Sequence, residues 1–286
     1  MLSEAMELAN RVALSDGTPE LRRKVQWLVE RSTLHQDIHL FTSTGGGHLP
    51  GALLLSPSEG PDGYSAELFV DVPFRRQGIG TELIAKAKSS QDIESFRLWN
   101  HGHTLSGAAF AVAQGFSIYQ QLVIMEIDIG NTVHSPLTHA ATSAMNGYQL
   151  VPLNRLVAGS NWKNVLNTAY RKNSDYGEII SRSSWFDPEL CLLALDINDQ
   201  MTLGLIIGRR ASRDGVPAVE IHAMAVDPKF RGRGVASALV SGAVSRWLSE
   251  KSRRVFSYVD KSNAAAASAY VRAHLKPVSD ELVYRT

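Results

Sequence analysis

The sequence has a single cysteine, no long hydrophobic run and no excess of charge of one sign. Cys191 is the only cysteine among 286 residues, which excludes an intramolecular disulfide and any cysteine-rich zinc or iron–sulfur site. No apolar run approaches the roughly 18–20 residues that span a bilayer. The 29 Lys and Arg against 28 Asp and Glu give a formal net charge of +1, which argues against a nucleic-acid binder that works by bulk electrostatics.

The amino-terminal residues also lack the features of a secretion signal. Residues 1–11 contain Glu4 and Glu7 and have neither the basic start nor the apolar run of a signal peptide. The composition, 44% hydrophobic and 20% charged, is ordinary for a soluble chain with room for two domains of about 140 residues. We therefore expect a cytoplasmic protein that binds neither a membrane nor nucleic acid.

The chain contains an internal repeat. Residues 70–80 match residues 226–236, with Val, Asp, Phe, Arg and Gly recurring and with Ile/Val and Gly/Ala as close exchanges. In each half the matched segment follows a strand-like run and precedes a helix, a second strand, a second alanine-rich helix and a terminal strand. The expected elements are Glu67–Val70, Gly80–Lys88, Phe96–Asn100, Leu105–Gln114 and Tyr119–Ile129, and Val219–Val226, Ala236–Leu248, Arg254–Val259, Ala264–Ala273 and Pro277–Arg285. This shared order favours duplication, with each terminal strand closing its own half.

The repeat predicts two tandem α/β domains. Residues 135–147 are small, polar and uncharged, and we expect them to link a domain at 1–134 to a domain at 148–286. Near the start, Thr18-Pro19-Glu20 has the N-cap, the proline and the acidic first turn of a helix.

The repeated loop is suited to phosphate. Its glycines let the backbone approach a ligand closely, and the free N–H groups at the following helix start attract anions. A tight turn without a ligand is the alternative. No Gly-x-x-x-x-Gly-Lys-Ser/Thr occurs, and no Gly-x-Gly-x-x-Gly with a matching acidic residue, so a P-loop is excluded and a dinucleotide fold disfavoured. Residues 45–47, three glycines, are expected to form a hairpin turn.

The loop Arg-x-x-Gly-x-Gly/Ala, at Arg75–Gly80 and Arg231–Ala236, resembles the acetyl-CoA pyrophosphate loop of the GCN5-related N-acetyltransferases. That resemblance implies, in each half, a mixed and mostly antiparallel sheet flanked by helices and splayed between its fourth and fifth strands. Further segments, in order, resemble the tandem-domain mycothiol synthase family. These are Ala66–Val70, Leu98–Gly102, Trp185–Pro188, Val226–Pro228 and Tyr258–Tyr270.

The resemblance implies acetyl transfer from acetyl-CoA to the cysteinyl amine of a cysteine–glucosamine–inositol conjugate, giving mycothiol. It implies a small-molecule amine acceptor, direct transfer and no metal, and we expect a monomer. Residues 171–180 depart from the family pattern, so another small amine or a peptide N-terminus stays open as the acceptor. A CoA-binding module without turnover is the alternative from another class.

The same resemblance gives Glu220 the position of the general base and Tyr270 that of the general acid, and it places Glu220 and Tyr258 beside the acceptor. Judged by residue type alone, Glu220 is equally well an edge-strand surface residue and Tyr270 a core aromatic. Strand alternation, without a bulge, puts Glu220, His222 and Met224 on one face, opposite Ile221, Ala223 and Ala225.

The residues that the resemblance implies for acetyl-CoA fall in three segments of the second half and two of the first. They are Met224, Ala225 and Val226; Arg231, Gly232, Arg233, Gly234, Val235, Ala236 and Ser237; Asn263, Ala264, Ala265, Ala266, Ala267 and Ser268; Leu68, Phe69 and Val70; and Arg75, Arg76, Gln77, Gly78, Ile79 and Gly80.

The first half lacks both candidate catalytic groups. With the loops in register, Tyr64 takes the place of Glu220 and Ala111 that of Tyr270, so only the second domain is expected to be active. His101 and His103 form a possible metal pair, but no third ligand has convincing spacing and we assign no metal.

Overall fold

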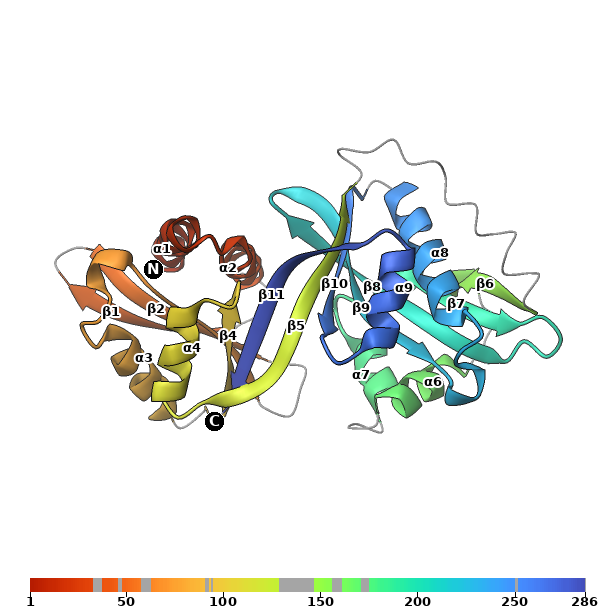
Figure 1. Ribbon diagram of the computed structural model, residues 1–286, viewed down its shortest axis with the longest axis horizontal. Coiled ribbons are helices and arrows are strands. Elements are labelled where there is room, and N and C mark those ends of the chain that lie inside the picture. Colours follow the sequence, from red (N-terminus) through yellow and green to blue (C-terminus); the bar gives the residue numbers. More distant parts are fainter. Residues whose placement is uncertain are drawn as a thin grey trace. The chain divides into compact units, whose positions relative to one another are not determined.

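The computed structural model divides the chain into two compact units, shown in Figure 1. Unit 1 comprises Met1–Val123 and Ser279–Thr286, and unit 2 comprises Ile124–Val278. The structure describes residues 1–32, 38–45, 48–57, 63–90, 93, 95–128, 147–155, 161–170, 175–249 and 252–285.

Unit 1 is a sheet with helices on both faces, and its strand order is β1-β2-β3-β4-β11. All neighbouring pairs are antiparallel except β3 and β4, which are parallel. Its elements are α1 (Leu2–Asp16), α2 (Pro19–Ser32), β1 (His39–Gly45), β2 (His48–Pro57), β3 (Tyr64–Val70), η1 (Val72–Phe74), α3 (Ile79–Lys88), β4 (Phe96–His101), α4 (Leu105–Ala113) and the strand β11 (Lys276–Arg285).

The two faces of this sheet are covered by different helix pairs. Alanine and leucine at helical spacing on α1 and α2 pack against Ala52, Leu54 and Phe69. The opposite face of the sheet packs against α3 and α4 around Leu53, Leu83 and Phe96. The predicted start of α2 at Pro19 is confirmed.

Unit 2 repeats this design with the strand order β5-β10-β9-β8-β7-β6. The pair β9 and β10 is parallel, and β6 to β9 are antiparallel neighbours. Its elements begin with β5 (Ser117–Asp128), which belongs to unit 2 from Ile124 onward. The others are β6 (Tyr148–Pro152), η3 (Leu153–Arg155), α6 (Trp162–Ala169), α7 (Tyr176–Arg182), η4 (Pro188–Leu190), β7 (Cys191–Asp196), β8 (Thr202–Arg213), β9 (Val216–Val226), η5 (Pro228–Phe230), α8 (Val235–Ser249), β10 (Arg254–Asp260) and α9 (Ala264–Arg272).

A glycine lets α8 approach the sheet of unit 2 closely. A Cβ added at Gly208 would lie 2.7 Å from the Trp247 indole and 2.8 Å from the Val219 side chain. Trp247 is fully buried, so the indole occupies the space that a side chain at Gly208 would need. The other face packs α6 and α7 over Leu193, Leu205 and Ala223.

The predicted order of strand, loop, helix, strand and helix is confirmed in both halves, but the prediction that each terminal strand closes its own half is wrong. Glu281–Arg285 of β11 pair with Arg97–His101 of β4, and Leu282 and Tyr284 fill the core of unit 1. Conversely, Ile124 of β5 belongs to a core cluster of unit 2. Strand periodicity determines which side chains face a core, whereas the sheet that a strand joins depends on the tertiary structure.

The predicted linker at 135–147 lies outside the described residues, apart from Gly147. The middle of the predicted turn at residues 45–47 also lies outside them. Within the parts of the chain that the structure describes, no helix is both long and apolar enough to cross a membrane.

Candidate functional site

The parallel strands of each unit separate soon after they begin to pair. In unit 2 the first pair between β9 and β10 joins Ala218 to Arg254, and the last joins Glu220 to Phe256. In unit 1 the first pair between β3 and β4 joins Tyr64 to Phe96, and the last joins Ala66 to Leu98. In this pairing Ala66 of unit 1, and not Tyr64, takes the place of Glu220, so the position predicted by aligning the two loops differs by two residues.

Beyond Glu220, side chains take over hydrogen bonding to the main chain of β9. Ser257 Oγ donates to Ile221 O over 3.2 Å. The Tyr170 hydroxyl accepts from Met224 N over 3.3 Å and donates to Met224 O over 3.5 Å. Arg231 Nε donates to Val226 O over 3.4 Å. This edge of β9 is thus available for hydrogen bonding by groups that are not part of a neighbouring strand.

Glu220 lies at the point where the two strands part and is paired with a cation. Arg209, its cross-strand neighbour on β8, donates to Glu220 Oε2 from Nε over 3.2 Å and from Nη2 over 2.6 Å. Burial raises the pKa of Glu220, but Arg209 and His222 outweigh it and hold this pKa well below its usual range. Glu220 is therefore ionised at neutral pH and is a weak base.

A bulge at His222 overturns the predicted division of faces. The β8–β9 register shifts between Gly208–Ile221 and Ile207–Ala223, which leaves His222 as an extra residue. Beyond the bulge, Ala223 and Ala225 pack with Ile207 in the core cluster beneath α6. Ile207 and Arg209 are two residues apart on β8 and share a face, so Ala223 and Ala225 lie on the face of the Arg209–Glu220 pair. The His222 ring lies 4.4 Å from the Trp185 ring, and its Nδ1 is 3.8 Å from Glu220 Oε1.

Tyr270 lies on α9 and approaches the same part of β9 as Glu220. Its hydroxyl lies within hydrogen-bond distance of Ser257 Oγ, at 3.3 Å, and Ser257 Oγ donates its proton to Ile221 O, one residue after Glu220. Burial raises the pKa of Tyr270 to about 12, so its phenol stays protonated at neutral pH. A protonated phenol and an ionised carboxylate thus approach adjacent residues of β9, and the two groups suit opposite roles in proton transfer.

The repeated loop has the same backbone shape in both units. Gly232 and Gly234 have φ of 77° and 79°, and the matching Arg76 and Gly78 have φ of 63° and 84°. These left-handed residues bring the chain into the first turn of α8 or α3, where N–H groups have no partner within the helix. The geometry suits a phosphate group.

The first arginine of each loop holds the loop to its own strand. Arg75 Nε donates to Val70 O over 3.0 Å, just as Arg231 Nε donates to Val226 O. In unit 1 the remaining guanidinium nitrogens of Arg75 are held by Asp16 at 2.9 and 2.8 Å. This carboxylate lowers the positive charge that the unit 1 loop offers to an anion.

The other predicted residues of unit 2 divide between the helix start and the sheet. Asn263 caps α9 by accepting from Ala266 N over 3.1 Å, which places residues 264–268 in the first turns of that helix. Tyr258 packs edge-on against Phe256, with ring centroids 6.1 Å apart. Glu178, in the segment that departs from the family pattern, forms ion pairs with Lys163 and Arg182.

Unit 1 contains a cavity of about 510 Å³. Its lining includes eight of the nine predicted residues of the first half, Gln77 being the exception; the eight are Leu68, Phe69, Val70, Arg75, Arg76, Gly78, Ile79 and Gly80. The side chain at the place of Tyr270 is the buried Ala111, and Ala66, also buried, takes the place of Glu220 in the strand pairing. The cavity thus combines the loop with neither of the two candidate catalytic groups.

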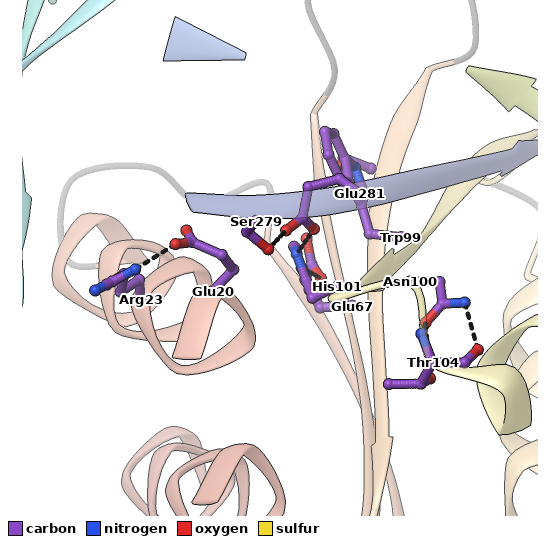
Figure 2. A network of polar contacts seen from close by, with 10 residues as sticks. Glu20, Arg23, Glu67, Trp99, Asn100, His101, Thr104, Ser279 and Glu281 are labelled. Atoms are coloured by element: carbon purple, nitrogen blue, oxygen red, sulfur yellow. Dashed lines mark hydrogen bonds and ion pairs between the residues drawn. The ribbon is translucent and has the colours of Figure 1, made fainter. Parts of the chain in front are cut away.

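A buried cluster of charged groups borders this cavity (Figure 2). His101 Nε2 lies 2.8 Å from Glu67 Oε2, and His101 Nδ1 lies 2.5 Å from Glu281 Oε2. Burial lowers the pKa of His101, but the two carboxylates outweigh it and raise this pKa to about 10. Since both ring nitrogens are engaged, His101 is arranged to hold β3, β4 and β11 together.

Several of these residues escaped prediction. Arg209, Ser257 and Glu281 carry no motif, and each reaches its partner only through strand pairing. No role was predicted for Tyr170; it is the last residue before the segment 171–180, which departs from the family pattern. Among the described residues no group of three or more His, Cys, Asp or Glu is arranged to hold a metal ion.

The comparisons place this geometry in a known class. Residues 160–274 match the Acetyltransferase (GNAT) family. The fold is similar to a GCN5-related N-acetyltransferase from Sphaerobacter thermophilus, with a TM-score of 0.75 at 18% identity over 99% of this chain and 91% of that one. It is also similar to a tandem GNAT protein from the clavulanic acid biosynthesis pathway, with a TM-score of 0.67 at 16% identity over 100% and 94%. The chain is an N-acetyltransferase with the tandem GNAT fold.

A closer likeness exists at the level of sequence. The chain is 25% identical to the mycothiol acetyltransferase of Kocuria rhizophila over 99% of its own length and 95% of that protein. The predicted resemblance to the mycothiol synthase family is confirmed.

Proposed function

We propose that the chain transfers the acetyl group of acetyl-CoA to the cysteinyl amine of a cysteine–glucosamine–inositol conjugate, and that unit 2 performs the reaction. The observation that carries the proposal is the convergence of Glu220 and Tyr270 on β9, where its pairing with β10 ends. Similarity to a mycothiol acetyltransferase over nearly the whole chain supports the acceptor. A cytoplasmic location agrees with this substrate.

The donor fits the residues of unit 2. The pyrophosphate would lie on the loop 231–237, whose two left-handed glycines lead into the first turn of α8, where N–H groups have no partner within the helix. The pantetheine amides and the thioester carbonyl would hydrogen-bond to the edge of β9 at residues 224–226, which no strand among the described residues covers. The first turns of α9 form the other wall.

The reaction is a direct transfer. The amine nitrogen forms a bond to the thioester carbonyl carbon, and the carbon–sulfur bond breaks. Glu220 accepts the amine proton through water, and Tyr270 gives its proton to the departing thiolate. Cys191 is buried, and burial with the nearby Asp187 raises its thiol pKa to about 12, so an acyl-enzyme on Cys191 is not part of the proposal.

The test is acetylation of the thiol-sugar beside a panel of other amines, including peptide N-termini, followed by mass spectrometry. Glu220→Gln should lower kcat/KM by about 10²-fold, the lower end for acid–base catalysis, because Arg209 makes Glu220 a weak base. Tyr270→Phe should lower it by a similar factor. Glu189→Gln, an exposed matched control in η4, should leave the rate unchanged.

Each outcome has a distinct meaning. Preference for the thiol-sugar supports the proposal. Transfer to another amine alone refutes the acceptor and retains the chemistry. Equal rates in the wild type and both variants refute the roles of Glu220 and Tyr270. Binding of acetyl-CoA without any transfer supports a binding module instead.

A further inference from the structure

The main chain of Met224 has a side-chain partner at the place where β9 lies open to ligands. The Tyr170 hydroxyl accepts from Met224 N over 3.3 Å and donates to Met224 O over 3.5 Å. Both distances are long for hydrogen bonds to a hydroxyl, which indicates weak bonds. The phenolic oxygen thus takes the Met224 N–H in the way that a carbonyl oxygen would.

Three side chains serve this edge of β9, and they differ in how firmly they are held. Ser257 lies within β10 and is 2% exposed, so it cannot leave without disturbing the sheet. Arg231 belongs to the phosphate loop itself. Tyr170 follows the last residue of α6, and the residue as a whole is 37% exposed. Of the three, Tyr170 is the partner that a ligand can displace at least cost to the fold.

The ring of Tyr170 has a packing partner besides the main chain of β9. Its ring packs on Tyr176 of α7, with centroids 4.9 Å apart at 42°, which is a contact between two helical segments on one side of the sheet. Rotation about the Tyr170 side-chain bonds would move the hydroxyl away from β9 without unfolding α6. Side-chain rotations of this kind are fast compared with turnover.

We propose that the Tyr170 hydroxyl is a placeholder for the thioester carbonyl oxygen: it occupies the Met224 N–H in the free enzyme, and the acyl donor displaces it. The inference rests on the proposed function for the identity of the donor. It makes Tyr170 a determinant of donor affinity, because binding exchanges one hydrogen bond at Met224 for another. The exchange weakens binding of the acyl donor and not of free CoA, which has no carbonyl oxygen at that position.

The experiment compares Tyr170→Phe with the wild type and with Tyr176→Phe, a matched control that removes a hydroxyl from the neighbouring ring. The readouts are KM for acetyl-CoA, the inhibition constant of CoA against acetyl-CoA, and kcat. Tyr170→Phe should lower KM for acetyl-CoA by about 2- to 10-fold, the scale of one weak hydrogen bond. It should change CoA inhibition less and leave kcat within about twofold, because the hydroxyl has left before the chemistry.

An unchanged or higher KM for acetyl-CoA in Tyr170→Phe would overturn the proposal. A fall in kcat beyond about tenfold would also overturn it, because the phenol would then act in the transfer itself. These outcomes are separate from failure of the proposed function. If the wild type acetylates only another amine, the same constants are measured with that amine. If it acetylates none, direct titration of acetyl-CoA and CoA tests the placeholder in the same two variants.

Discussion

Replacement of His101 by leucine should strongly destabilise unit 1. The change removes the cation that lies between Glu67 and Glu281, all three being at most 6% exposed. Two buried carboxylates would remain without their partner, and loss of one member of a buried ion pair costs about 3–5 kcal/mol. His101 also lies in the sheet at the end of β4, where β11 pairs with it, so β11 should lose its hold on unit 1.

The assay is urea unfolding, with hydrogen exchange of unit 1 peptides to separate this unit from unit 2. Lys86→Ala is the control, since it removes an exposed helix pair with Glu82 and an exposed hydrogen bond to Thr42 O, which together should cost about 1 kcal/mol. A loss below about 1 kcal/mol in His101→Leu would refute the reasoning. The triple variant His101→Leu, Glu67→Gln, Glu281→Gln should lose less unfolding free energy than His101→Leu alone, because no unpaired buried charge then remains.

The same cluster predicts the direction of a pH effect. The pKa of His101 is about 10 in the folded state and about 6.5 in an unfolded chain, so folding favours its protonated form. The stabilisation is complete below about pH 6.5 and is lost as pH rises toward about 10. The stability difference between the wild type and His101→Leu should therefore shrink across that window, and a constant difference would contradict the assignment.

Two glycine substitutions test the packing and the loop of unit 2. Gly208→Ala would place a methyl group 2.7 Å from the Trp247 indole, and overpacking of this kind should cost about 1–3 kcal/mol; an unchanged Tm would show that α8 can shift without cost. Gly234→Ala would force a side chain onto a φ of 79°, at a cost of about 1–2 kcal/mol, and should raise KM for acetyl-CoA with little change in kcat. An unchanged KM would remove the loop from donor binding.

The sequence alone determined the duplication and the local structure of each half. The repeated Arg/Gly loop predicted a strand before it and a helix after it, and the left-handed glycines at 232 and 234 have the conformation that such a loop requires. Helix and strand periodicity are local properties, so α3, α8, β4 and β10 were predicted to within a few residues. Aligning the two loops put Tyr64 at the place of Glu220, whereas the strand pairing puts Ala66 there, because strand register is not a local property.

Tertiary structure alone decided which groups meet. Strand periodicity cannot say which sheet a strand joins, so the pairing of β11 with β4, and with it the contact of Glu281 with His101, was not predictable. The bulge at His222 moved Ala223 and Ala225 onto the face of Glu220, because one extra residue reverses the alternation. Arg209 sets the charge state of Glu220 from eleven residues away, since cross-strand register places the two side by side.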